Sequence, residues 1–143
     1  MTGDPDGLAI LEKLSEFPSA RIRYIPDADP DSIPSVGPCL VFLMAFWSGP
    51  SVRGFSNLTK ALNDIGTDDL ELVVVDVDGS PDLYQLPEIK ALFGEVVRSP
   101  RGVGEVAFCR DGQPVRAAII GSDDRPRDYE SSAKEFLSSC GIG

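Results

Sequence analysis

The sequence predicts an α/β domain whose central sheet carries helices on both faces. Two mostly apolar segments, residues 39–46 and 70–77, are typical of strands that are covered on both sides. Each is followed by residues with the three- and four-residue spacing of an amphipathic helix. Nearer the C-terminus, Asp111-Gly112 separates two further strand-like segments and favours a tight hairpin, because both residues tolerate positive φ. A mixed sheet is therefore expected.

The N-terminal part predicts a helix, a strand and a long loop. A length of 143 residues fits one domain, which we expect to span residues 8–143 after a flexible N-terminus of residues 1–7. Leu8, Leu11, Leu14 and Phe17 have helical spacing, and Pro18 ends the helix. Residues 21–25 alternate as a strand, and the four prolines of residues 26–38 favour a loop.

The middle and the C-terminal part complete the pattern. After the central strand at 39–46, apolar residues from Val52 to Ile65 predict a helix that ends at Gly66. The expected elements that follow are a strand at 70–77, a helix at 83–93 interrupted near Pro87, strands at 104–110 and 113–120, and a helix from Tyr129 to Cys140.

Charge and composition exclude several classes of partner. The net charge of −10 repels phosphate backbones and anionic lipid, so no nucleic acid is expected to bind. The acidic N-terminus lacks the basic region of a signal peptide. The longest apolar run, residues 39–47, is far shorter than the roughly 20 residues of a membrane span. We expect a cytoplasmic protein without membrane contact, and the oligomeric state stays open.

The cysteines and the missing histidine restrict the chemistry. Cys39, Cys109 and Cys140 form neither a C-x-x-C pair nor a zinc pattern, so reduced thiols are expected. The chain contains no histidine, which removes Ser-His and Cys-His pairs and histidine metal ligands. Cys109 lies between Phe108 and Arg110 in a strand, and we interpret it as structural. The sequence predicts no catalytic residue, metal site or cofactor.

The turn after the central strand reads Phe46-Trp47-Ser48-Gly49-Pro50-Ser51. It resembles the W-C-G-P-C turn of thioredoxins, with each cysteine replaced by serine. The segments VVVDVDGSPDL and CRDGQPV are also similar to that family, and the resemblance covers roughly residues 21 to 140. It implies a thioredoxin-like three-layer fold, with a central mixed sheet, helices on both faces and an extra N-terminal helix.

The same resemblance implies a redox-inactive member of the thioredoxin-like superfamily. Dithiol exchange needs a thiolate that attacks a disulfide and a second thiol that resolves the product, and Ser48 and Ser51 supply neither. Phe42 stands where thioredoxins carry a buried acid. Gly104 falls where they carry a cis-proline, and because a cis bond without proline costs about 2.5–4 kcal/mol, we expect a trans bond between Val103 and Gly104.

Two interpretations of the serine turn follow. In the first, the serines only cap N–H groups at the helix start, and Trp47 folds into the core. In the second, the turn is a docking face for a protein or peptide, and the chain is a binding, chaperone or adaptor module. The candidate binding residues are Trp47, Ser48, Gly49, Pro50, Ser51, Val103 and Gly104. The fold also predicts that Cys39 and Cys109 lie close together on adjacent antiparallel strands. Directly opposite Cβ atoms are about 4.5–5.5 Å apart, near enough for a disulfide only with strain, so two free thiols are expected.

An enzyme alternative uses the acids after the second buried strand. The segment LELVVVDVDGSPDL is similar to the signature of haloacid-dehalogenase phosphatases, which implies Asp76 as nucleophile, Asp78 as acid/base and magnesium held with Asp123 and Asp124. Fewer than half of the residues follow Asp76, too few for the further strand-helix units of that fold. Asp76 and Asp78 are also explained by ending a strand and capping a helix at Pro81.

Overall fold

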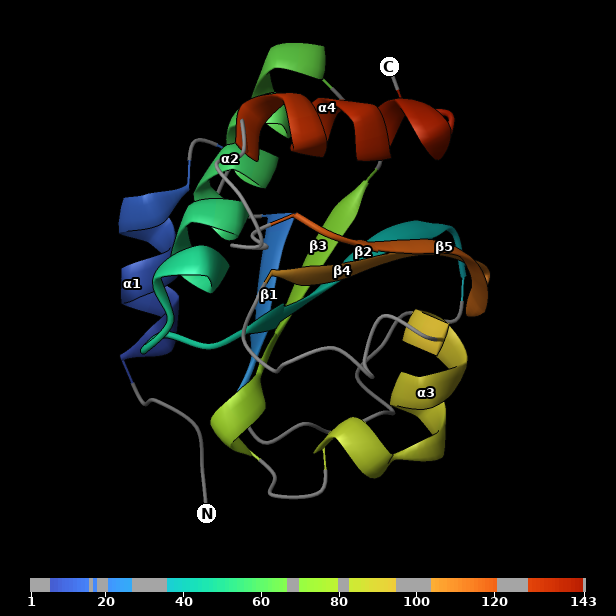
Figure 1. Ribbon diagram of the computed structural model, residues 1–143, viewed down its shortest axis with the longest axis horizontal. Coiled ribbons are helices and arrows are strands. Elements are labelled where there is room, and N and C mark those ends of the chain that lie inside the picture. The colour runs from blue at the N-terminus through green and yellow to red at the C-terminus, as the bar shows by residue number, and fades with distance from the viewer. Residues whose placement is uncertain are drawn as a thin grey trace.

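In the computed structural model, residues 6–15, 17, 21–26, 36–66, 70–79, 83–94, 104–120 and 129–142 are described. The elements follow the order expected from the sequence (Figure 1). They are α1 (Gly7–Leu14), β1 (Ile22–Ile25), β2 (Pro38–Met44), α2 (Gly49–Ile65), β3 (Glu71–Asp76), α3 (Pro87–Phe93), β4 (Glu105–Arg110), β5 (Gln113–Ile119) and α4 (Tyr129–Ser139), with short 3₁₀ turns at Val77–Gly79 and Leu83–Gln85.

The five described strands form one mixed sheet in the order β1-β3-β2-β4-β5. β1 and β2 run parallel to β3, whereas β4 runs antiparallel to both β2 and β5. Every residue of β2 and β3 after the first is buried, which explains why these two segments are so apolar. The predicted mixed α/β sheet is confirmed.

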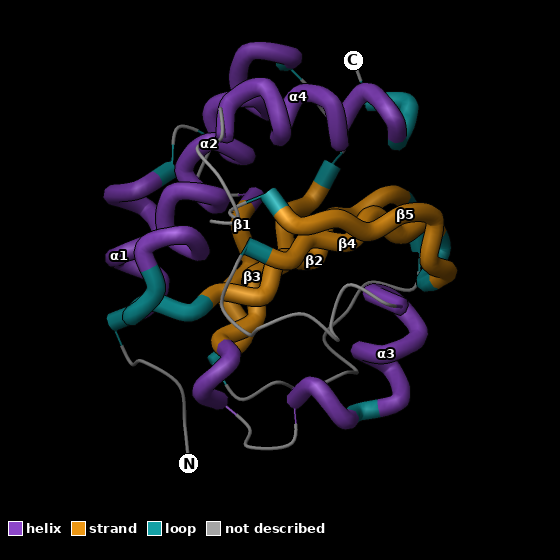
Figure 2. The backbone as a smooth tube through the Cα atoms, viewed as in Figure 1, coloured by secondary structure: helices purple, strands orange, loops and turns teal. Residues whose placement is uncertain are grey.

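The two faces of the sheet have separate cores. Leu40, Phe42 and Met44 of β2 point to one face, where they pack with buried residues of α1, α2 and α4. Cys39, Val41 and Leu43, which alternate with them, point to the other face and pack with residues of α3. The result is a three-layer arrangement with α1, α2 and α4 on one side and α3 on the other (Figure 2).

Local sequence signals explain two chain reversals. Asp111 and Gly112 both have positive φ, 53° and 77°, as a two-residue type I′ hairpin requires. The Asp111 carboxylate also accepts a hydrogen bond of 2.7 Å from the N–H of Gly37 at the start of β2. Gly66 ends α2 in the left-handed region, with φ 75°, and its N–H donates to the carbonyl of Leu62.

The first and third helices are shorter than their apolar patterns. α1 ends at Leu14, although Phe17 is still buried, because the Ser15 hydroxyl oxygen accepts a hydrogen bond of 2.9 Å from the Phe17 N–H and turns the chain. The interruption near Pro87 is confirmed, since a 3₁₀ turn precedes it and α3 begins there. None of the described helices is long and apolar enough to cross a lipid bilayer.

β5 is an edge strand with little protection from solvent. Its first four residues are exposed, and Val115 is 52% exposed. The register between β4 and β5 shifts between Phe108 and Cys109, so that Cys109 lies opposite Pro114. The pairing of β4 with β5 is therefore least regular beside Cys109.

Candidate functional site

The serine turn connects the end of the central strand β2 to the start of α2. The Ser48 N–H donates a hydrogen bond of 3.0 Å to the Ala45 carbonyl, and the Ser48 carbonyl accepts one of 3.0 Å from Val52. Pro50 occupies the first turn of the helix, where its missing N–H costs no helical hydrogen bond. The candidate residues from Trp47 to Ser51 therefore lie together beyond the C-terminal end of the central strand β2.

Ser51 is a structural residue of this turn. Its side chain is fully buried, and its Oγ accepts a hydrogen bond of 3.0 Å from the Ala45 N–H. The Ser51 hydroxyl in turn lies 3.5 Å from the Met44 sulfur. The capping interpretation is therefore wrong for Ser51, because the N–H group that its side chain satisfies belongs to Ala45, just after β2, and not to the helix. Ser48 is at the N-cap position, but its side chain makes no capping hydrogen bond.

Trp47 is exposed, so the expectation that it folds into the core is wrong. Trp47 is 65% exposed, and it is the aromatic residue among the exposed large apolar residues of the described ranges. Phe46, the residue before it, packs against the core instead. Gly49 is also exposed, and the Arg53 guanidinium lies so close that a Cβ on Gly49 would be 3.2 Å from it. The surface beside Trp47 thus combines a large ring, bare backbone and one cation.

The two positions beneath and beside the turn differ from thioredoxin as the resemblance implies. Phe42 is fully buried, and its ring meets Phe55 of α2 edge to face with centroids 5.6 Å apart. Gly104 is buried with φ 84°, and its carbonyl accepts a hydrogen bond of 2.9 Å from Ile120. It precedes Glu105, which lies opposite Leu43, so β4 starts at the edge where the turn lies. Val103 and its bond to Gly104 lie outside the described residues.

The carboxylate of Asp76 is committed to the fold. Asp76 is 1% exposed, its Oδ2 accepts a hydrogen bond of 2.8 Å from the Tyr24 hydroxyl, and its Oδ1 accepts one of 2.8 Å from the Asp78 N–H. These contacts fit the interpretation in which Asp76 ends a strand. Asp123, Asp124 and Pro81 lie outside the described residues. Within the described ranges, no group of three or more His, Cys, Asp or Glu residues is placed to hold a metal ion.

The predicted proximity of Cys39 and Cys109 is confirmed. They lie directly opposite each other on β2 and β4, both are fully buried, and both are free thiols. A hydrogen bond between the two thiols lowers the pKa of Cys39 and raises that of Cys109, and burial raises the pKa of Cys109 further. Cys140, at the end of α4, is a separate buried thiol whose pKa is raised by burial.

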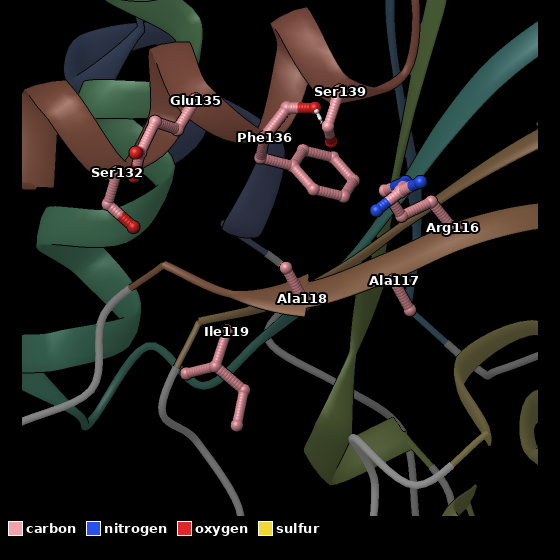
Figure 3. Close-up of a pocket in the computed structure, with 8 residues that line it drawn as sticks. All are labelled: Arg116, Ala117, Ala118, Ile119, Ser132, Glu135, Phe136 and Ser139. Atoms are coloured by element: carbon pink, nitrogen blue, oxygen red, sulfur yellow. Dashed lines mark hydrogen bonds between the residues drawn. The ribbon is translucent and has the colours of Figure 1, made fainter.

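A groove lies away from the turn, between β5 and α4. This open groove of about 400 Å³ was not predicted from the sequence (Figure 3). Arg116 and Ala118 point from β5 toward α4, where Phe136 faces them, whereas Ile119 points to the other side of the strand. None of the candidate residues lines the groove. The lining residues are Arg116, Ala117, Ala118, Ile119, Ser132, Glu135, Phe136 and Ser139.

Comparison with known proteins identifies the fold. No protein-family model matches the sequence, and no curated protein matches it either. Among solved structures, the oxidised thioredoxin of Plasmodium falciparum is similar, with a TM-score of 0.55 and 14% identity over 85% of this chain and 99% of that one. The protein Trxlp from Edwardsiella tarda EIB202 has a TM-score of 0.53 and 23% identity, covering 81% of this chain and 96% of that one.

A third similar structure comes from work on thiol resolution in yeast mitochondrial 1-Cys peroxiredoxin through the glutathione and thioredoxin systems. Its TM-score is 0.51, with 22% identity over 86% of this chain and 94% of that one. The chain therefore has the thioredoxin-like fold, as the sequence predicts. Because the sequence identities are below 25%, these structures establish the fold but not the activity, which we infer from the site.

Proposed function

We propose that the chain is a redox-inactive thioredoxin-like module that binds a protein or peptide at the serine turn, as a chaperone or adaptor. The observation that carries this proposal is the pairing of an exposed Trp47 with a turn whose two reactive positions are serines. A large exposed ring is costly to keep in water, and tryptophan is among the residues that contribute most to binding energy.

The chemistry of the turn supports the redox-inactive part of the proposal. A serine hydroxyl ionises far above neutral pH and forms no reversible bond to sulfur, so neither attack on a disulfide nor resolution of a mixed disulfide has a group to perform it. The Ser51 hydroxyl is also buried and bonded to the backbone. Phe42, in place of a buried acid, offers no proton acceptor beneath the turn.

The shape of the turn supports docking of an extended segment. Trp47 and Gly49 are exposed next to each other, so a partner chain can place an apolar side chain on the ring and its own backbone over Gly49. Arg53 adds a positive charge at this place in a chain of net charge −10, which favours a partner segment with a carboxylate near its apolar residue. The reduced cysteines are in keeping with a cytoplasmic site of action.

An insulin-reduction assay with a dithiol donor tests the redox-inactive part. The wild-type protein should give no turnover above the uncatalysed rate. Cys109→Ser, which leaves no neighbouring pair of thiols, should behave in the same way. Turnover well above background in both proteins would overturn the proposal.

A pull-down from the source cell, comparing wild type with Trp47→Ala, tests the docking part. We expect the same partner to be captured by wild type and lost at least tenfold with Trp47→Ala, while the free energy of unfolding changes by less than about 1 kcal/mol, since the side chain is exposed. Val115→Ala, which truncates an exposed apolar side chain on β5, should keep the partner. Equal capture by all three proteins would remove Trp47 from the binding face.

A further inference from the structure

The thiols of Cys39 and Cys109 form a cross-strand pair near the start of β2, at the opposite end of this strand from the serine turn. Cys39 is the second residue of β2, and Cys109 is the residue before the last of β4. The two stand in direct register, and their thiols share a hydrogen bond. Cys140 lies in the other core, packed on α2 and α4 residues.

The backbone geometry suits a covalent bond between the two sulfurs. The Asp111 N–H donates to the Gly37 carbonyl, so Gly37 and Asp111 have the position of a hydrogen-bonded pair, although the Gly37 N–H donates to the Asp111 carboxylate instead of the backbone. Such pairs alternate along an antiparallel ladder, which makes Cys39 and Cys109, two positions further on, a hydrogen-bonded pair as well. The Cα atoms of such pairs are about 5.5 Å apart. Disulfides usually span about 4.4–6.8 Å between Cα atoms, which this spacing meets. The Cβ atoms of directly opposite residues are about 4.5–5.5 Å apart, whereas a disulfide needs about 3.5–4.5 Å, so the bond requires a small approach of the two strands and some strain.

The irregular pairing beside Cys109 is the place where a small oxidant can reach the buried pair. The pair is buried, but Cys109 is opposite Pro114, at the register shift between β4 and β5. The hairpin tip follows directly, and Arg110, Asp111 and Gln113 are exposed. Ladder ends with an irregular register open more readily than the centre of a sheet. Local opening at this end of the hairpin is therefore the route by which we expect a small oxidant to reach the pair from the Cys109 side.

The pKa values of the two thiols are shifted in opposite directions, which distinguishes their chemical roles. The hydrogen bond donated by the Cys109 thiol lowers the pKa of Cys39; burial and the nearby Glu71 carboxylate oppose this, and the Arg23 charge assists it. Arg23 Nε lies 2.9 Å from Glu71 Oε1, an ion pair that lacks hydrogen-bond alignment. Cys39 is therefore the sulfur better able to become the nucleophilic thiolate, and Cys109 holds the proton.

We propose that Cys39 and Cys109 are oxidised by a hydroperoxide to a reversible cross-strand disulfide, which makes this pair a peroxide-responsive site distinct from the serine turn. The Cys39 thiolate attacks one oxygen of hydrogen peroxide and becomes a sulfenic acid, while the O–O bond breaks and hydroxide leaves; the hydroxide takes up the proton that the Cys39 thiol released and forms water. The Cys109 sulfur then attacks the Cys39 sulfur, and the sulfenic oxygen leaves as a second water. Two thiols and one peroxide thus give one disulfide and two waters.

Mass spectrometry of the native protein tests this proposal. Reduced Cys140→Ser protein is treated with hydrogen peroxide at neutral pH, denatured, and alkylated with N-ethylmaleimide. We expect an intact mass lower by about two hydrogens, no alkylated thiol, a cross-linked peptide joining Cys39 to Cys109, and full reversal by reduced glutathione. The same link should form in wild-type protein, in which Cys140 alone is alkylated.

Two variants and one alternative outcome keep the test decisive. Cys109→Ala should convert peroxide treatment into sulfinic acid on Cys39, because the resolving thiol is missing. Cys39→Ala should leave Cys109 unmodified at the same dose. Circular dichroism before treatment verifies that both variants are folded. Recovery of both thiols in the Cys140→Ser protein, or irreversible oxidation without a cross-link, would overturn the proposal and would leave the docking proposal untouched.

Discussion

The rings of Tyr24 and Phe46 meet edge to face, with their centroids 6.0 Å apart. This contact joins β1 to the residue that precedes Trp47, and it holds Phe46 against the core while Trp47 turns to solvent. The Tyr24 hydroxyl also donates to the buried Asp76 carboxylate. One side chain therefore supports both the exit of β2 and the end of β3.

Tyr24→Phe separates these two roles. The variant keeps the ring contact with Phe46 but removes the hydrogen bond from the Tyr24 hydroxyl to Oδ2 of the buried Asp76, which we expect to cost about 1–3 kcal/mol. Urea unfolding measures the loss. Tyr24→Leu, which removes the ring as well, should cost more, and a Tyr24→Phe protein as stable as wild type would show that water replaces the hydroxyl.

Gly7→Ala should destabilise the protein although alanine favours helices. A Cβ on Gly7 would overlap the Tyr24 ring, so α1 must shift or the ring must move. Overpacking of this kind costs about 1–3 kcal/mol. Thermal unfolding of Gly7→Ala and of the double variant Gly7→Ala with Tyr24→Leu provides the test. If the clash is the cause, the added cost of Gly7→Ala is absent when Tyr24 is leucine.

Ser48→Cys combined with Ser51→Cys should give a protein that forms a disulfide at the turn but reduces insulin poorly. The two positions have the spacing of the thioredoxin pair, whereas Phe42 and Gly104 remain without an acid or a cis-proline. Ser51→Cys also weakens the hydrogen bond to the Ala45 N–H, at a cost of about 1 kcal/mol. Thiol titration with and without oxidant and an insulin assay measure both effects. Thioredoxin-like turnover would contradict the expectation.

Glu130 should add stability only above mildly acidic pH. The hydrogen bond from Lys134, followed by the charge of Lys60, lowers the pKa of Glu130 on the surface between α2 and α4. A lowered folded-state pKa contributes stability above the unfolded-state pKa of about 4.3, and this contribution disappears as the pH falls through the folded-state pKa.

Glu130→Gln should therefore lower the urea midpoint slightly at pH 7 and match wild type near pH 3. Lys134→Met, which removes one of the two partners of Glu130 and leaves Lys60, should show a pH dependence in the same direction. A difference from wild type that persists unchanged at pH 3 would assign the effect of Glu130→Gln to packing.

Strictly local signals made most of the fold predictable. The apolar pattern of 39–46 and 70–77 reports burial on both faces, and Asp111-Gly112 and Gly66 encode positive φ through their own residue types. These features depend on neighbours in the chain, and each was predicted. Gly7 was not recognised, since the close approach of Tyr24 depends on packing between α1 and β1.

The candidate site was only partly predictable, for the same reason. The sequence motif identified the turn. An aromatic residue directly after a central strand, such as Trp47, can lie either in the core or on the surface, and the motif does not decide between them. Packing decides the matter at Trp47, because the neighbouring Phe46 occupies the inner position. The partner of Ser51 is the N–H of Ala45 across the turn, and Arg53 reaches Gly49 from the next turn of α2. Contacts of this kind exist only after the chain has folded.

The irregular edge strand β5 also affects how readily this protein aggregates. An exposed strand is a template on which a strand of another molecule can add, and repeated addition leads to aggregation. Pro114 removes a donor from this edge, and the exposed Arg116 would have to be covered by an incoming strand. Pro114 and Arg116 therefore disfavour the pairing of β5, with its exposed Val115, to a strand of another molecule.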